Sequence, residues 1–122
     1  MYEFMSLDRC AAYVAARSAL IAVQRVAGGW PDTLAERARR EAIETMQVTA
    51  EATAYDHATA GRRRCLRDAL TSAIGLAASI DVARAMGFGD IELDDVQRTA
   101  GRTVALLGMF LHANTAAVPA AR

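Results

Sequence analysis

Apolar residues recur at three- and four-residue steps along most of the chain, which predicts helices rather than strands. The pattern breaks at Gly28 and Gly29, at residues 55–61 and at residues 87–91. These breaks leave four expected helices, over residues 7–26, 33–54, 62–86 and 92–113. Four helices with short connections predict an all-α fold, an antiparallel up-down-up-down four-helix bundle.

The second expected helix has the clearest boundaries and the densest charge. Pro31 breaks the chain ahead of it, and Thr33 with Glu36 fits a capping box that would start the helix. Its apolar face is expected to contain Leu34, Ala38, Ala42, Thr45 and Thr49. On the opposite face, charges of opposite sign stand four residues apart, as Glu36–Arg40, Arg37–Glu41 and Arg40–Glu44. Each such pair stabilises a helix by roughly 0.2–0.5 kcal/mol.

The other three helices each have a predicted buried seam. In the first helix, which Ser6 would cap, the seam is Leu7, Cys10, Val14 and Ile21, widened by Tyr13, Leu20 and Val23. So wide an apolar arc indicates a central helix or one that meets a second subunit. The third seam is Leu66, Leu70, Ala73, Ala77 and Ile80, and Gly87 is expected to end that helix in a left-handed conformation. The fourth seam is Val96, Ala100, Val104, Leu107 and Leu111.

Composition narrows the class of protein. The 122 residues are 53% hydrophobic and only 6% aromatic, so the core of the single expected domain, residues 1–113, is built from small side chains. Residues 114–122 contain Pro119 and are expected to fray. Fourteen arginines balance fourteen acidic residues, which argues against a dedicated nucleic-acid binder. The longest strongly apolar run, residues 104–111, is too short to cross a membrane, and the N-terminus lacks the basic region of a signal peptide. We therefore expect a cytoplasmic protein with no membrane partner.

No catalytic constellation is visible in the chain. Neither His57 nor His112 follows a Glu at the spacing that di-metal bundles use, and His57 falls in an expected loop. Cys10 and Cys65 lie far apart with no histidine or acid at a suggestive spacing, which favours two reduced core thiols. The prediction is a protein that is not an enzyme and that has no catalytic residues, no metal site and no cofactor.

Six arginines are candidates for binding an anionic partner. Arg62, Arg63, Arg64 and Arg67 crowd the first turns of the third helix, where cations oppose the helix dipole. Two explanations stay open: local pairing of Arg64 with Asp68, helped by Glu51 or Asp56, or contact with RNA, DNA or an acidic protein surface. Arg39 and Arg40 are weaker candidates because Glu36 stands three and four residues before them.

Two glycines indicate a possible interface between subunits. Gly101 and Gly108 lie seven residues apart inside a helical pattern and so share a face, where each costs roughly 1 kcal/mol relative to Ala. With Ala78 and Ala105, they suggest a groove where another helix backbone approaches closely. The alternative is compositional drift in a sequence rich in small residues.

The order of these features resembles the four-helix-bundle family of ribosomal-RNA intervening-sequence proteins and accessory variability determinants of diversity-generating retroelements. The residues that carry the resemblance are Leu34, Arg39-Arg40, Ala42, Ala50-Glu51, Gly61 with Arg62, Arg63 and Arg64, Ser72-Ala73 and Met86-Gly87, within residues 2–113. Val48, Ala52 and Gly75 stand where the family commonly has Asn, Gly and Glu, which puts a polar contact between the second and third helices in doubt.

The resemblance implies a homopentamer of bundles arranged as a barrel. For the retroelement members it also implies binding of nucleic acid and of a reverse transcriptase, although those members look strongly basic and this chain is neutral. The sequence thus favours a non-enzymatic homo-oligomer that acts as an adaptor or scaffold. The alternative is a nucleic-acid-binding accessory factor that partners a reverse transcriptase.

Overall fold

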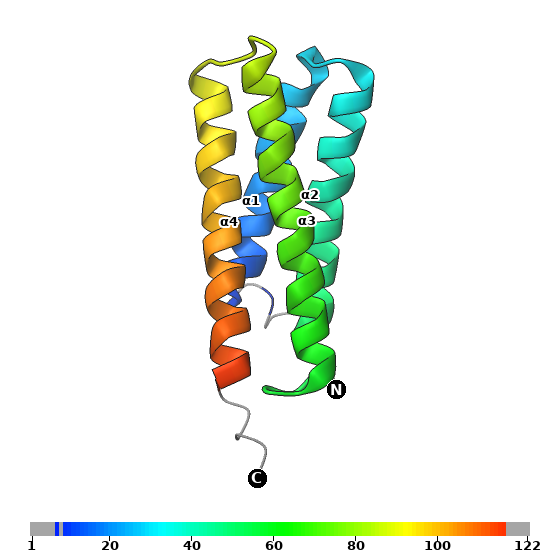
Figure 1. The fold of residues 1–122 in the computed structure, drawn as a ribbon, viewed down its shortest axis with the longest axis vertical. Coiled ribbons are helices and arrows are strands. Elements are labelled where there is room, and N and C mark those ends of the chain that lie inside the picture. Colours follow the sequence, from blue (N-terminus) through cyan, green and yellow to red (C-terminus); the bar gives the residue numbers. More distant parts are fainter. Residues whose placement is uncertain (1–6, 8, 117–122) are drawn as a thin grey trace.

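Four long helices lie side by side in the computed structural model, which describes residue 7 and residues 9–116 (Figure 1). They are α1 (Ala11–Val26), α2 (Asp32–Ala52), α3 (Ala60–Ala85) and α4 (Ile91–Ala116), with a short 3-10 helix, η2 (Ala27–Gly29), after α1. The described residues contain no strand. The predicted all-helical architecture is confirmed.

The helices form an up-down-up-down bundle. Packing is extensive between α1 and α2, α2 and α3, α3 and α4, and α4 and α1, so each helix packs mainly against its two neighbours around the bundle. The α1–α2 and α3–α4 connections lie at one end of the bundle, and the α2–α3 connection lies at the other (Figure 1). Short connections place consecutive helices antiparallel, as the sequence predicted.

Alanine dominates the core. One cluster of buried residues surrounds Trp30, near the end that holds the α1–α2 turn, and includes Val23, Leu76, Ile80 and eight alanines. A second cluster, toward the other end, contains Leu66, Leu107 and Cys65. Small side chains at so many buried positions let the helix backbones pack closely, and they leave few large side chains to fill the interior.

The start of α2 differs from the sequence prediction. The helix begins at Asp32 with Pro31 at the N-cap, and no side chain caps it. Because the N-cap lies two residues before Thr33, Thr33 is already inside the first turn, so the predicted Thr33–Glu36 capping box is wrong. The Glu36 carboxylate instead pairs with Arg40, whose Nη2 lies 3.3 Å from Glu36 Oε1.

The outer boundaries of the bundle also shift. The helix α1 starts at Ala11 rather than at Leu7, because Cys10 is extended and donates its N–H to the Leu7 carbonyl at 3.0 Å. The predicted cap Ser6 lies outside the described residues. At the other end, α4 continues to Ala116, three residues beyond its predicted end, while residues 117–122 lie outside the described residues.

The turn between α3 and α4 follows the prediction. Gly87 has a φ of 98°, the left-handed conformation that favours glycine. The Phe88 N–H donates to Ala83 O at 3.1 Å and the Gly87 N–H donates to Arg84 O at 3.0 Å, the bond pair of a Schellman motif. Three residues later, Asp90 Oδ1 accepts the Leu93 N–H at 2.8 Å and so caps α4.

Candidate interaction surfaces

The outer face of α1 carries large apolar side chains. Val14 is 44% exposed and Ile21 is 45% exposed, so their predicted place in the buried seam is wrong. The face of α1 that packs into the bundle consists of Ala12, Ala15, Ala16, Ala19, Ala22 and Val23. The alanines also recur at three- and four-residue steps, and they allow a closer approach to α2 and α4 than valine and isoleucine would.

The charges on this outer face are all positive. Arg17 and Arg25 are exposed, and α1 contains no acidic residue. Beside it, Arg9, Val14, Arg98 and Arg102 help to line an open hollow of about 660 Å³ between α1 and α4. Arg98 is paired with Asp95, but no ion pair is formed by Arg9 or Arg102 within the described part of the chain. The outer face of α1 is therefore both basic and apolar.

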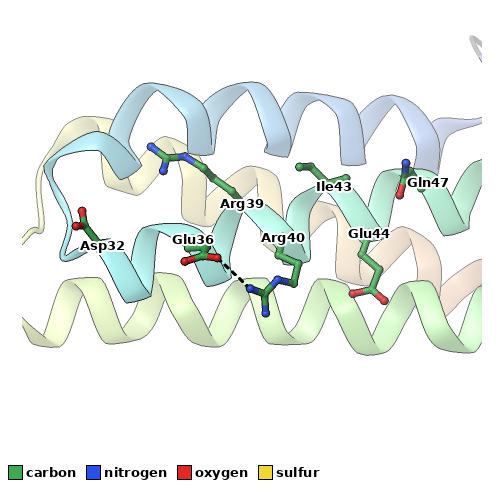
Figure 2. Close-up of a pocket in the computed structure, with 7 residues that line it drawn as sticks. All are labelled: Asp32, Glu36, Arg39, Arg40, Ile43, Glu44 and Gln47. Atoms are coloured by element: carbon green, nitrogen blue, oxygen red, sulfur yellow. Dashed lines mark hydrogen bonds and ion pairs between the residues drawn. The ribbon is translucent and has the colours of Figure 1, made fainter.

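The outer face of α2 has a different character. Figure 2 shows its open hollow, with Ile43 on the side nearer α1 and with Glu36, Arg40 and Glu44 on the side nearer α3. Ile43 is 44% exposed. The Glu36–Arg40 and Arg37–Glu41 pairs are formed as predicted, at 3.3 and 3.7 Å, but the predicted Arg40–Glu44 pair is not. Glu44 therefore keeps an uncompensated charge beside Ile43.

The six candidate arginines do not form one site. The Arg39 guanidinium donates through Nε to Gln24 Oε1 on α1 at 3.0 Å. Arg40 precedes Glu41, whose carboxylate reaches Gly75 of α3, so Arg40 lies at about the level of Gly75 along the bundle. On α3, Arg67 comes eight residues before Gly75 and Arg64 comes eleven residues before it. At about 1.5 Å of rise per residue, these two groups of arginines are roughly 12–17 Å apart along the bundle.

Two of the arginines at the start of α3 stabilise the preceding loop. Arg62 donates through Nη1 to the Tyr55 carbonyl at 3.1 Å, and Arg63 donates through Nη1 to the Ala58 carbonyl at 2.9 Å. Thr59 caps α3, since its hydroxyl accepts the Arg62 N–H at 3.2 Å. Arg62 and Arg63 thus have a local role that the sequence did not indicate.

Arg64 and Arg67 remain without such contacts. Both side chains are exposed, and the predicted Arg64–Asp68 ion pair is not formed within the described part of the chain. Neither Glu51 nor Asp56 approaches to ion-pair distance there. Their two positive charges lie at the end of the helix dipole that disfavours cations, facing solvent.

The two glycines of α4 meet nothing within this chain. A Cβ built at Gly101 or at Gly108 would have no neighbour within 4 Å, apart from the chain neighbours and the helix's own backbone. The expected close approach of another helix is therefore wrong within one subunit. Contact with a second subunit stays a prediction.

Gly75 of α3 makes room for a side chain of α2 that the sequence did not reveal as its partner. A Cβ there would overlap Glu41 Oε2, and Ser79 donates its hydroxyl to Glu41 Oε1 at 2.7 Å. The Glu41 side chain is only 15% exposed. A polar contact between α2 and α3 therefore exists, carried by Glu41 from α2 across the space that Gly75 leaves.

The groups with reactive chemistry are scattered. No three His, Cys, Asp or Glu side chains in the described residues are placed to hold a metal ion. Cys65 is a free thiol in the core, and burial raises its pKa, with the Glu51 carboxylate adding to the rise. A thiol with a raised pKa is a poor nucleophile at neutral pH, which fits the structural role predicted for it. In the described residues, no helix is long and apolar enough to cross a membrane.

Comparison with protein-family models gives no match, and comparison with curated proteins gives none either. The resemblance to the intervening-sequence and retroelement accessory family stays a prediction. The same holds for the pentamer and the partners that this resemblance implies.

Proposed function

We propose that the protein is a non-enzymatic scaffold or adaptor that assembles with copies of itself. The observation that carries this proposal is the distribution of apolar side chains on α1, where alanines face the core and Val14 and Ile21 face outward. Fully burying a valine or isoleucine is worth about 1.5–3 kcal/mol, so half-exposed ones leave part of that stabilisation ungained. A second subunit that covers this face would recover it.

Exposed apolar residues on the other helices support the same proposal. Ile43 of α2, Ile74 and Val82 of α3 and Met109 of α4 are each at least 44% exposed. Apolar surface on more than one side suits a subunit with neighbours on two sides, as in a ring-like homo-oligomer. The number five comes from the family resemblance alone, and the assignment of Gly101 and Gly108 to the interface rests on their seven-residue spacing.

Sedimentation equilibrium at micromolar concentration tests the assembly. We expect the wild-type chain to show a multiple of 13.0 kDa and a Val14→Ser/Ile21→Ser variant to show a mass near 13.0 kDa with unchanged helix content. A Met86→Ser variant is the matched control, because Met86 is exposed at the C-cap of α3 and does not line the hollows between α1 and α4, and its mass should stay at the wild-type value. A wild-type mass of 13.0 kDa would refute the proposal.

The second candidate function is that of a nucleic-acid-binding accessory factor for a reverse transcriptase. It is favoured by Arg64 and Arg67, which are exposed and have no ion-pair partner within the described chain. In a ring of subunits this pair would recur around one rim and concentrate positive potential there, although the net charge is zero.

Fluorescence anisotropy with RNA and duplex DNA at two salt concentrations tests this candidate. Arg64→Ala/Arg67→Ala is the informative variant, since Arg62 and Arg63 also hold the α2–α3 loop. Each lost phosphate contact should reduce the magnitude of the log–log salt slope on duplex DNA by about 0.9. The matched control, Arg37→Ala/Arg98→Ala, removes the same charge from two ion-paired positions. Equal loss of binding in both variants would point to net charge rather than to a site.

A further inference from the structure

We infer that the outer face of α1 in one copy binds the outer face of α2 in a second copy, an interface that rests on the self-assembly proposed above. Each face presents exposed aliphatic side chains at its centre, and the charges around those centres are opposite in sign. The occupant of each face is therefore another copy of this chain.

The α1 face offers two aliphatic side chains within a positive field. Val14 and Ile21 are seven residues apart, so they lie on one side of the helix about 10 Å apart. Arg17 lies between them along the chain and Arg25 lies one turn beyond Ile21; both are exposed, and neither has an ion-pair partner in the described residues. No acid lies on α1 itself, although Arg25 lines a hollow beside α4 together with Glu92, Asp94 and Asp95.

The α2 face offers one aliphatic side chain within a mostly negative field. Ile43 is followed directly by Glu44 and, two turns later, by Glu51, and both carboxylates are exposed without an ion pair among the described residues. Of the three α2 arginines, Arg37 and Arg40 are paired with acids of the same helix, and Arg39 is held by Gln24. Asp32, also exposed and unpaired there, adds a further negative charge at the start of the helix.

The signs of the charges also determine which faces meet. Two α1 faces would place arginines opposite arginines, and two α2 faces would place carboxylates opposite carboxylates, so neither symmetric pairing is favoured. Joining α1 of one copy to α2 of the next uses different surfaces on the two copies. Such a head-to-tail contact gives each subunit two neighbours and closes into a ring when the rotation between copies permits.

Charge reversal tests the pairing through three variants of the full chain. The first is Arg17→Glu/Arg25→Glu, the second is Glu44→Arg/Glu51→Arg, and the third combines all four substitutions. In sedimentation equilibrium we expect the first and second variants alone to be monomers. The third variant should regain the wild-type mass, because each reversed face then meets a reversed face of opposite charge. An equimolar mixture of the first two should form species heavier than 13.0 kDa in which the two variants alternate.

Controls keep the outcomes distinct. Arg64→Glu/Arg67→Glu reverses two charges at the start of α3 and should leave the mass unchanged. Circular dichroism should show wild-type helix content in every variant; if a reversal unfolds the chain, the milder Arg17→Gln/Arg25→Gln should still raise the dissociation constant by up to about tenfold.

A wild-type mass of 13.0 kDa would overturn the proposed function and this inference together. A wild-type oligomer that persists in the first and second variants would overturn the α1–α2 pairing alone. A folded third variant that stays monomeric would overturn it as well, since the reversed faces would then not meet.

Discussion

The helices α1 and α4 pack side by side, yet they fill the core with side chains of different size. In α4, Leu93, Val96 and Leu107 are at most 1% exposed, although Ile91 and Met109 face outward. In α1, alanines face the core and the larger Val14 and Ile21 face outward. A helix that uses its smallest residues inside and its larger ones outside has two apolar faces, and the second face is available for another subunit.

Truncating an apolar side chain should lower the free energy of unfolding much more in the core face of α4 than on the outer face of α1. This difference is the largest expected effect. Leu107→Ala should lower the free energy of unfolding by about 2–5 kcal/mol, because it leaves a cavity in the core. Ile21→Ala should lower it by less than about 1 kcal/mol at concentrations where the chain is monomeric. Urea denaturation of both variants provides the measurement. If Ile21→Ala lowered the free energy of unfolding as much as Leu107→Ala, at every protein concentration, Ile21 would lie in the core of one subunit. The proposed difference between α1 and α4 would then be wrong.

Enlarging alanines on the two sides of α1 sharpens the same comparison. Ala16 is buried, so Ala16→Leu should cost about 1–3 kcal/mol by overpacking. Ala11 is exposed on the same helix, and Ala11→Leu should change the free energy of unfolding by no more than about 0.5 kcal/mol. Thermal melts of the two variants compare the faces directly. A tolerated Ala16→Leu would mean that the α1 core face is loosely packed.

Replacing a glycine with alanine should have different effects on the free energy of unfolding in α3 and in α4. Gly101→Ala should stabilise the chain by up to about 1 kcal/mol, because the new Cβ meets open space and alanine favours a helix. Gly75→Ala should be neutral or destabilising by about 1 kcal/mol, since its Cβ would displace Glu41 from Ser79. The displaced hydrogen bond offsets the gain in helix propensity.

A double-mutant cycle isolates the cause. In a Glu41→Ala background, Gly75→Ala should become stabilising by about 1 kcal/mol, because the carboxylate that it overlapped is gone. If Gly75→Ala has the same effect in both backgrounds, the Glu41 carboxylate does not determine its cost. Gly101→Leu adds a separate comparison: if the face of Gly101 and Gly108 contacts a second subunit, the substitution should dissociate the oligomer without lowering the melting temperature of the subunit.

The smallest expected effect concerns the loop that α4 holds at the far end of the bundle. Ala58 has a φ of 69°, and its N–H donates to Asn114 Oδ1 at 2.7 Å. Ala58→Gly should stabilise the chain by about 0.5–1 kcal/mol, because glycine adopts this conformation without strain. The matched control is Ala54→Gly, at an exposed loop position without positive φ, which should be neutral or destabilising. Equal melting temperatures for the two variants would count against strain at Ala58.

The sequence predicted the features that depend on local rules. Gly87 ends α3 as expected because only glycine adopts that φ readily. In the predicted α4 seam, Val96, Ala100 and Leu107 are buried, since they follow one stripe of the helix. The predicted α1 seam was wrong because α1 has two apolar faces, one of alanines and one with Val14 and Ile21. The larger side chains of the second face led to the prediction that it was the buried one. The predicted Thr33–Glu36 capping box was wrong because the N-cap of α2 lies two residues earlier, at Pro31.

Other features depend on how the helices pair, which no local pattern specifies. The Glu41–Ser79 contact requires the register between α2 and α3, although an interior glycine at position 75 was a usable signal. Arg62 and Arg63 donate hydrogen bonds to carbonyl groups of the α2–α3 loop, whereas Arg64 does not. This difference depends on the path of residues 53–59, which no local pattern specifies.

Hydroxyl-radical footprinting with mass spectrometry tests most directly whether the outer face of α1 is covered by another copy. Modification rates of Val14 and Ile21 are measured at protein concentrations below and above assembly, with Met86, 53% exposed at the end of α3, as the internal reference. We expect the rates of Val14 and Ile21 to fall severalfold as the mass rises, while the rate of Met86 stays constant. Unchanged rates at Val14 and Ile21 in the assembled protein would show that this face remains in solvent and would contradict the account.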